Sequence, residues 1–243
     1  MTDTIDLTQL PRVRRTAPTM LRPRDPQPRR LGDLAAHLGA DLDGSADTLV
    51  RGITLSSTDI VPGEVFVGIR GAHRHGAEFA GQAVSRGAVA VLTDREGADI
   101  AAGAGVPLVV VADPRLALAD AASWVNRTSP RDELPILLGT TGTNGKTSVT
   151  HLLEGILTQI GVTAGASTSA ERVVAGERVV AGLTSPEAPE FHAQLARMRE
   201  AGVEAVAIEV SAQAVTRHRV DGVVFDVMAF TNLSHDHLDD YAD

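Results

Sequence analysis

The 243-residue sequence contains no cysteine, which excludes disulfides, thiolate metal sites and cysteine nucleophiles. No apolar run approaches the roughly 18–20 residues of a membrane helix, and the first residues lack the hydrophobic stretch of a secretory signal. The formal net charge of −9 argues against a nucleic-acid-binding surface. These absences predict a cytoplasmic globular protein with no membrane and no nucleic-acid partner.

Lysine is almost absent as well. The 22 basic residues include a single lysine, Lys146, and all the others are arginine. This skew, together with abundant alanine, indicates a coding bias that replaces lysine wherever arginine suffices. We therefore expect Lys146 to occupy a position that needs a compact ammonium rather than a planar guanidinium.

Three segments follow one another along the chain. Residues 1–30 hold seven arginines and five prolines with little apolar periodicity, which predicts a disordered basic tail. Such a tail is more often simply solvated than bound to an anionic partner. An α/β block extends over 31–127, a polar stretch at 127–133 is predicted to be a linker, and a second block covers 134–243.

Periodicity predicts the elements of both blocks. The first block is expected to contain helices near 31–38, 78–85 and 114–126 and strands at 49–55, 64–69, 88–93 and 108–112. The second is expected to contain strands at 135–138, 203–210 and 223–230, a hairpin at 172–182, and helices over about 149–160 and 189–201. The helix near 149–160 places its apolar residues on one face. Successive strand–loop–helix units predict mostly parallel sheets that are covered on both faces.

A glycine-rich loop joins the strand at 135–138 to the helix that follows. Phosphate groups bind where unobstructed backbone amides, a helix N-terminus and a cation come together. Here Gly142 and Gly145 permit a tight turn, Lys146 supplies the cation, and Thr147 offers a hydroxyl to Mg²⁺.

The general phosphate-loop pattern G-x-x-x-x-G-K-[ST] is not strictly met, because Thr140 stands where its first glycine is required. A plain glycine-rich turn is therefore the alternative interpretation. The apolar strand before the loop, the amphipathic helix after it and the solitary lysine favour a nucleotide-binding loop.

The sequence Gly142-Thr-Asn-Gly-Lys-Thr-Ser148 resembles the ATP loop of the Mur ligase family, which carries the same departure. Stretches 54–68 and 71–79 resemble the UDP-sugar-binding domain of the MurE-type enzymes. Four further motifs follow in the family's order: Leu183-Thr-Ser-Pro-Glu187, Ile208-Glu-Val-Ser211, Arg219-Val-Asp-Gly222 and Phe230-Thr-Asn-Leu-Ser-His-Asp-His-Leu-Asp239. The resemblance implies a UDP-binding N-terminal α/β domain at 31–127 and an incomplete parallel-sheet ATPase domain of the P-loop type at 134–243.

The MurE-type enzymes that the sequence resembles use ATP and Mg²⁺ to add the third residue to UDP-N-acetylmuramoyl-L-alanyl-D-glutamate, a peptidoglycan precursor, through an acyl phosphate. The incoming amino acid, meso-diaminopimelate or L-lysine, is selected in the family's third domain, which the sequence lacks. The family's carbamylated lysine would lie beyond residue 243, because Lys146 is the only lysine. The resemblance therefore predicts a fragment that is inactive by itself.

The resemblance also assigns the site. The ATP-binding residues would be Gly142, Thr143, Asn144, Gly145, Lys146, Thr147 and Ser148, with Lys146, Glu209 and His237 as catalytic residues and Thr147, Glu209 and His237 as metal ligands. Glu209 ends a predicted buried strand, where ligands of parallel sheets collect, although an ordinary strand-end carboxylate is the alternative. The polar cluster His235, Asp236, His237, Asp239 and Asp240 by itself fits a solvated loop better than a metal site. Within it, the resemblance makes Asp236 and Asp239 structural.

For the substrate, the resemblance assigns Leu55, Ser57, Ala72, His73 and Arg74 to the uridine side and Thr184, Ser185, Ser211, Arg217 and Arg219 to the muramoyl peptide. Arg219 could hold a carboxylate through two hydrogen bonds. The sequence departs from the family at Ala212 and Gln213, where serine and histidine are usual, and Arg217 occupies a variable position. These departures concern peptide recognition and not the ATP site.

Two alternatives remain open. Another member of the same superfamily, such as a folylpolyglutamate or cyanophycin synthetase, would share the ATP loop but should lack the 55–74 block. A non-catalytic nucleotide-binding or regulatory module would keep the ligand contacts without turnover.

Overall fold

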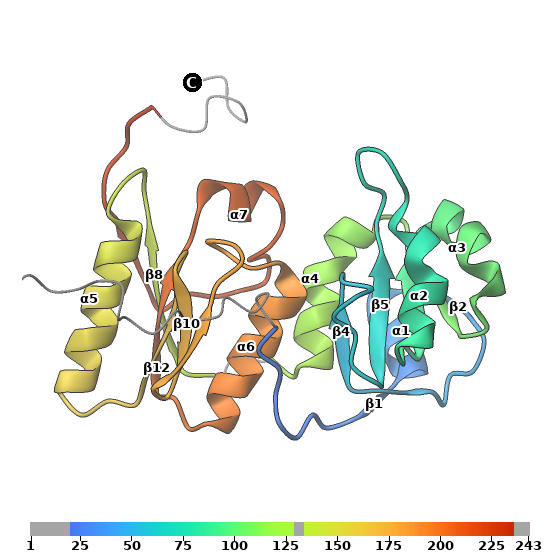
Figure 1. The fold of residues 1–243 in the computed structure, drawn as a ribbon, viewed down its shortest axis with the longest axis horizontal. Helices are drawn as coiled ribbons and strands as arrows, with labels where there is room; N and C mark the ends of the chain where they lie inside the picture. The colour runs from blue at the N-terminus through green and yellow to red at the C-terminus, as the bar shows by residue number, and fades with distance from the viewer. Residues whose placement is uncertain (1–19, 129–133, 236–243) are drawn as a thin grey trace, which may run out of the picture.

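The computed structural model describes residues 20–128 and 134–235, which form two main sheets with helices around them and one small two-stranded sheet (Figure 1). One sheet has five strands in the order β2-β7-β6-β5-β4, and the other has six in the order β11-β10-β9-β12-β8-β13. The predicted α/β class is confirmed. Across the described residues, no helix combines the length and the apolar character needed to cross a membrane.

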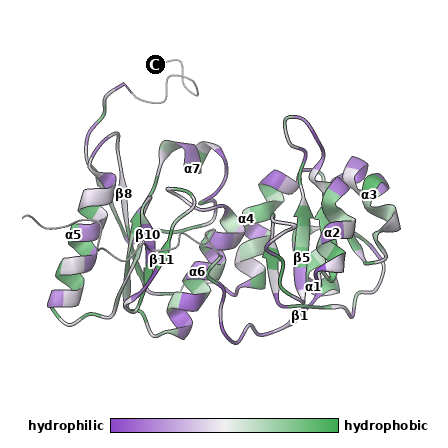
Figure 2. Ribbon diagram, viewed as in Figure 1, coloured by the Kyte–Doolittle hydropathy of each residue, from purple (hydrophilic) through white to green (hydrophobic). Residues whose placement is uncertain are grey.

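The five-stranded sheet is built from short buried strands. Its parallel strands are β4 (Gly52–Thr54), β5 (Glu64–Gly68), β6 (Ala90–Thr93) and β7 (Leu108–Val110), and β2 (Asp41–Asp43) pairs antiparallel at one edge. Every residue of β5 and β6 is buried, as expected for strands covered on both faces, and β5 carries the hydrophobic colour in Figure 2.

Helices cover both faces of this sheet. They are α1 (Leu31–Leu38), the 3₁₀ helix η2 (Gly76–Phe79), α2 (Ala80–Ser85), α3 (Arg95–Ala101), η3 (Ala102–Ala104) and α4 (Pro114–Val125). The cap of α4 agrees with the predicted start, because Asp113 accepts hydrogen bonds from the amides of Arg115 and Leu116 and proline follows it. The sequence analysis missed β2 and α3, since both are short and rich in charged residues.

The six-stranded sheet carries the glycine-rich loop. Its parallel strands are β8 (Ile136–Thr141), β9 (Ala164–Ser167), β12 (Ala205–Glu209) and β13 (Val227–Phe230), and β10 (Glu171–Val174) and β11 (Glu177–Val180) form the predicted antiparallel hairpin. The helices are α5 (Lys146–Gln159), α6 (Ala188–Glu200) and α7 (Ala212–Thr216). Most predicted elements of this block are confirmed, with boundaries shifted by a few residues.

Helix α5 differs from the expectation for an amphipathic helix. Its apolar residues Leu152 and Ile156 are 65% and 54% exposed, and only Thr150 of the helix is fully buried. The edge strand β13 is exposed as well, with Phe230 64% accessible. Among the described residues, β13 is the edge strand of this sheet, next to β8.

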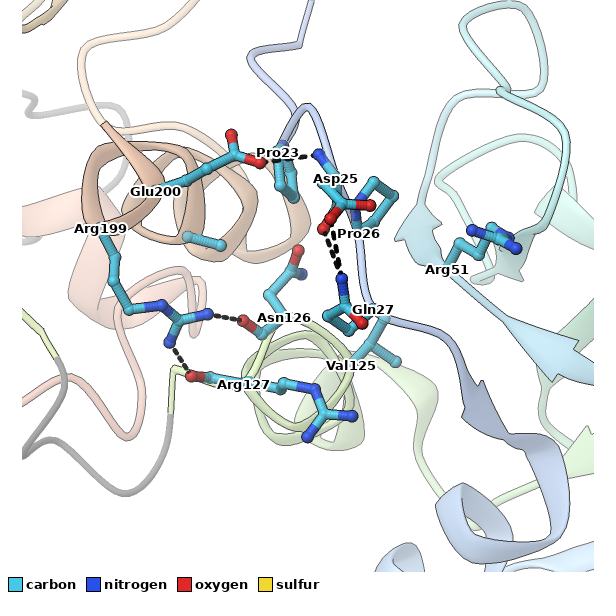
Figure 3. A pocket seen from close by; sticks show the side chains of 11 residues that line it. Pro23, Asp25, Pro26, Gln27, Arg51, Val125, Asn126, Arg127, Arg199 and Glu200 are labelled. Carbon is cyan, nitrogen blue, oxygen red and sulfur yellow. Dashed lines mark hydrogen bonds between the residues drawn. The ribbon is translucent and has the colours of Figure 1, made fainter. Parts of the chain in front are cut away.

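Residues 20–30 correct the prediction of a disordered tail, whereas residues 1–19 lie outside the described part. The Arg22 guanidinium contacts Glu64 at 2.6 Å and Asp59 at 3.2 Å, both in the five-stranded half. The amide of Arg24 donates to the Glu200 carboxylate at 2.8 Å. The amide of Asp25 donates to the same carboxylate at 2.7 Å (Figure 3). This bridging segment (residues 20–27) therefore joins the two halves, before β1 (Arg29–Arg30) pairs with β3 (Leu49–Val50).

Helices α4 and α6 pack against each other between the two sheets (Figure 1). At their contact, His192 Nδ1 lies 2.8 Å from Thr128 Oγ1, and Arg199 donates to the carbonyl of Asn126 at 3.1 Å. Figure 3 shows Arg199 reaching the end of α4 across a cavity of about 270 Å³ under the bridging segment. Of the predicted linker at 127–133, residues 129–133 lie outside the described residues.

Buried His192 is expected to make the fold sensitive to acid. Burial lowers its pKa to about 4 from 6.5, an effect that the negative charge of Asp120 opposes only in part. Between these pH values the unfolded chain binds the proton and the folded chain does not. The free energy of unfolding is therefore at its full value above about pH 6.5. As the pH falls from 6.5 towards 4, protonation of the unfolded chain lowers this free energy by about 3 kcal/mol.

Unfolding in urea at pH 7.0, 5.5 and 4.5 checks this expectation. In His192→Gln the loss of unfolding free energy with acid should be smaller than in the unmodified chain. The control is His37→Gln, which replaces a histidine that is 37% exposed and lies beside Asp120. Parallel pH profiles for the His192 variant and the unmodified chain would show that this histidine does not contribute.

Candidate functional site

The glycine-rich loop turns sharply from β8 into α5. Gly142 and Gly145 have φ values of 125° and 85°, a region that favours glycine. A Cβ atom at Gly142 would lie 2.2 Å from Thr231 Oγ1, so no other residue fits there. Helix α5 begins at Lys146, and no side chain caps its N-terminus. Its first-turn amides have no partner within the helix and can bind an anion.

The ammonium of Lys146 lies against this loop. Its Nζ donates to the carbonyls of Gly142 at 2.7 Å and Thr143 at 2.8 Å. The one lysine of the sequence thus places its positive charge beside the free amides of the α5 N-terminus. This arrangement agrees with the compact cation expected from the sequence and can attract phosphate oxygens.

Glu209, at the end of β12, lies beside the start of α5. The Thr147 hydroxyl donates to Glu209 Oε2 at 2.9 Å, and the Ser169 amide donates to the same oxygen at 2.9 Å. Glu209 is only 3% exposed. A hydroxyl and a carboxylate are oxygen donors that suit Mg²⁺, which usually takes one or two carboxylates and completes its shell with water and phosphate.

Within the described residues, no other predicted metal ligand lies beside Thr147 and Glu209. Among residues 20–128 and 134–235, no group of three or more histidine and acidic side chains could hold a metal ion. His235 is exposed. The remaining predicted members of the cluster, Asp236, His237, Asp239 and Asp240, lie outside the described residues.

The segment after β13 fixes the loop, a role that the sequence analysis did not assign. The amides of Thr143 and Asn144 donate to Asn232, at 2.9 Å to its carbonyl and 3.1 Å to its side-chain oxygen. Thr231 Oγ1 donates to the Asn144 carbonyl at 2.7 Å, and the Ser234 amide donates to Thr143 Oγ1 at 2.9 Å. The signal was present, since these residues belong to the motif at 230–239.

Three predicted peptide-binding residues lie together next to Glu209. Ser185 Oγ donates to the Glu209 carbonyl at 3.2 Å and accepts from the Ser211 amide at 3.1 Å. Arg219 is 8% exposed and donates to the Ser185 carbonyl at 3.3 Å and to Glu187 at 2.9 Å. The peptide-side and nucleotide-side residues therefore meet at one strand end.

The other predicted peptide-side positions are more open. Thr184 is half-buried next to Ser185, and Arg217 is exposed at the end of α7. Ala212 and Gln213, where the sequence departs from the Mur pattern, begin α7 directly after Ser211, which caps this short helix.

The predicted uridine-side residues follow β4 and β5, whose carboxyl ends share one edge of the sheet. Leu55 and Ser57 come after β4, and Ser57 Oγ donates to Gln82 at 2.8 Å. Ala72, His73 and Arg74 lie on an exposed loop after β5, where Arg74 pairs with Glu78.

A cavity of about 200 Å³ lies between the five-stranded half and the start of α6. Leu55 and Asp59 line it from the five-stranded half, and Glu187 and Glu190 line it from the start of α6. Burial raises the pKa of Glu190, an effect that the charge of Arg172 partly offsets. Nearby, Glu187 also pairs with Arg115 of α4 at 2.7 Å, so ion pairs link the halves beside the cavity.

Comparisons with known proteins decide the family. Residues 140–243 match the Mur ligase middle domain, and residues 49–124 match the model described as Mur ligase family, catalytic domain. The chain belongs to the Mur ligase family. The matched regions of this Mur ligase chain fall on its six-stranded and five-stranded halves respectively, while the exact boundaries 31–127 and 134–243 stay a prediction.

Curated relatives are similar over almost the whole chain. The chain is 55% identical over 226 residues to the UDP-N-acetylmuramyl-tripeptide synthetase of Leifsonia xyli subsp. xyli. This alignment covers 93% of the chain and 44% of that relative. The chain is 42% identical over 228 residues to the UDP-N-acetylmuramoyl-L-alanyl-D-glutamate--2,6-diaminopimelate ligase of Streptomyces avermitilis, with 94% and 44% covered. The Mur ligase chain thus spans less than half the length of these relatives.

Solved structures share the fold of this Mur ligase chain. A structure of a UDP-N-acetylmuramoyl-L-alanyl-D-glutamate--2,6-diaminopimelate ligase superposes with a TM-score of 0.66 at 20% identity, covering 87% of the chain and 42% of that structure. The MurF ligase of Thermotoga maritima in complex with ADP superposes with a TM-score of 0.51 at 19% identity, covering 78% and 39%.

Proposed function

We propose that this chain forms the UDP-sugar-binding and nucleotide-binding parts of a MurE-type ligase. Such an enzyme adds the third amino acid to UDP-N-acetylmuramoyl-L-alanyl-D-glutamate with ATP and releases ADP. The observation that carries the proposal is the contact of Thr147 and Glu209 beneath the Lys146 loop, directly beside Ser185 and Arg219. The names of the curated relatives support the same reaction.

In this proposal the loop residues bind the nucleotide. Lys146 and the first amides of α5 bind the phosphate oxygens, and Thr147 and Glu209 would hold Mg²⁺. When bound, Mg²⁺ supplies positive charge that neutralises the phosphates during phosphoryl transfer. His237, which lies outside the described residues, is proposed as a further metal ligand from the resemblance alone.

The substrate side has to place a carboxylate next to the nucleotide. The substrate and ATP are both anionic, so a positive group must hold the peptide while its carboxylate attacks the γ-phosphorus and ADP leaves. Buried Arg219 can bind a peptide carboxylate, and Ser185 and Ser211 can orient the chain beside Glu209. Leu55, Ser57 and the loop 72–74 would contact the uridine end.

The third residue is proposed to be diaminopimelate or L-lysine. A reaction that consumes ATP and a UDP-linked precursor belongs in the cytoplasm, and the proposal needs no nucleic acid or membrane partner.

A product assay on the protein in its full natural length tests this function. UDP-N-acetylmuramoyl-L-alanyl-D-glutamate, ATP and Mg²⁺ are combined with single amino acids, and products are followed by mass spectrometry. We expect ADP and a product larger by one amino-acid residue with one member of the panel. Turnover only with a folate and glutamate would favour a different Mur-superfamily ligase, and ligand binding without any product would favour a non-catalytic module.

A further inference from the structure

A buried arginine lies behind the candidate site. Arg172 belongs to β10 and is only 2% exposed. Its guanidinium donates to two backbone carbonyls, those of Thr168 and Leu183, the second at 2.6 Å. Burial lowers the pKa of Arg172, while the charges of Glu190, 3.8 Å from its Nε, and Glu209 oppose this effect. Burying the positive charge of Arg172 is costly, and its guanidinium is stabilised there by hydrogen bonds to carbonyls of two different loops.

The first carbonyl belongs to the loop on the metal side (residues 168–170, the metal-side loop). Thr168 directly precedes Ser169, whose amide donates to Glu209 Oε2 at 2.9 Å. The hydroxyl of Ser169 lies 3.1 Å from that of Thr147. Arg172 therefore holds the backbone that orients the two candidate Mg²⁺ ligands.

The second carbonyl belongs to the loop on the peptide side (residues 183–185, the peptide-side loop). Leu183 directly precedes Thr184 and Ser185, two candidate peptide-binding residues. Ser185 contacts the Glu209 and Ser211 backbone through its hydroxyl and Arg219 through its carbonyl. One guanidinium thus bonds to both loops that border the candidate active site.

We propose that Arg172 is a positioning residue that holds the metal-side loop and the peptide-side loop in register, so that nucleotide–metal binding and peptide binding favour each other. The inference rests on the proposed function. A planar guanidinium donates to two carbonyls from two nitrogens at a fixed spacing, whereas a lysine ammonium carries all three of its donors on one nitrogen at the end of a flexible stem. We therefore expect a lysine at position 172 to keep the charge but to weaken the link between the two loops, because it lacks the second nitrogen.

The test compares Arg172→Lys with the unmodified chain by calorimetry. ADP is titrated with Mg²⁺ and again with EDTA, and UDP-N-acetylmuramoyl-L-alanyl-D-glutamate is titrated separately. For Arg172→Lys we expect the affinity for ADP with Mg²⁺ to fall about 10-fold, the usual size of effects on residues that orient metal ligands. The affinity for the UDP-peptide should also fall, while ADP binding in EDTA, which depends on Lys146, should stay within about twofold. Arg178→Lys is the matched control, since Arg178 lies half-exposed on the neighbouring strand.

A second measurement needs no variant and covers the case in which Arg172→Lys does not fold. In the unmodified chain, saturating ADP with Mg²⁺ should tighten binding of the UDP-peptide by about fivefold or more, a common size for coupled sites. Equal UDP-peptide affinities with and without ADP would overturn the inference. So would a folded Arg172→Lys chain with unchanged affinities, or one that loses ADP binding equally in EDTA. An unmodified chain that binds no ADP would instead refute the proposed function, and the inference with it.

Discussion

Replacing Lys146 by alanine is expected to weaken ADP binding by about 10- to 150-fold. Hydrogen bonds to charged groups contribute about 1.5–3 kcal/mol, which corresponds to this change in affinity. Lys146 is the only lysine in the sequence, and its Nζ already lies against the loop carbonyls. Calorimetry with ADP and Mg²⁺ on the full chain measures the loss.

Two further variants make the result specific. Arg95→Ala removes an exposed cation from α3 in the other half of the molecule and should leave ADP affinity unchanged. Lys146→Arg keeps the charge but places a larger planar group between the Gly142 and Thr143 carbonyls, so we expect it to restore little of the affinity. An alanine variant that binds ADP as tightly as the unmodified chain would show that the loop does not bind phosphate through this lysine.

Replacing Glu209 by glutamine is expected to remove the Mg²⁺ dependence of nucleotide binding. Glutamine preserves the shape and can still accept a hydrogen bond from Thr147, but it lacks the negative charge that attracts a divalent cation. ADP affinity in Mg²⁺ should therefore approach the affinity in EDTA. In the protein at its full natural length, kcat should fall by roughly 10²–10³, the size of effect seen when one electrostatic contact to a transition state is lost.

The control for this prediction lies next to the start of the same strand. Glu204 directly precedes β12, is exposed, and accepts a hydrogen bond from the Thr163 amide at 2.9 Å. Glu204→Gln should change neither the Mg²⁺ dependence nor kcat. Unchanged Mg²⁺ dependence in Glu209→Gln would mean that Glu209 only holds Thr147 and Ser169 and binds no metal.

Local patterns in the sequence were enough to predict where several helices, strands and turns of this protein lie. The Asp113-Pro114 pair predicted where α4 begins. The repeated Arg-Val-Val motif predicted the β10–β11 hairpin. The glycine-rich loop with its one lysine predicted the turn from β8 into α5. Each of these features depends on residues within about one turn or one hairpin of each other. Caps, turns and periodicity act at that range, so a single sequence is enough to find them.

Contacts between distant residues were decided only by the tertiary structure. The bridging segment has ordered contacts because Arg22 meets Glu64 and the amide of Asp25 meets Glu200, 175 residues away. The same holds for Asn232, which bonds to the glycine-rich loop, and for Arg172, which bonds to two loops. Periodicity placed the apolar residues of α5 on one face, but only the structure showed that Leu152 and Ile156 are exposed. Whether a charge is paired or an apolar face is covered depends on what the fold places opposite it, and spacing along the chain does not contain that information.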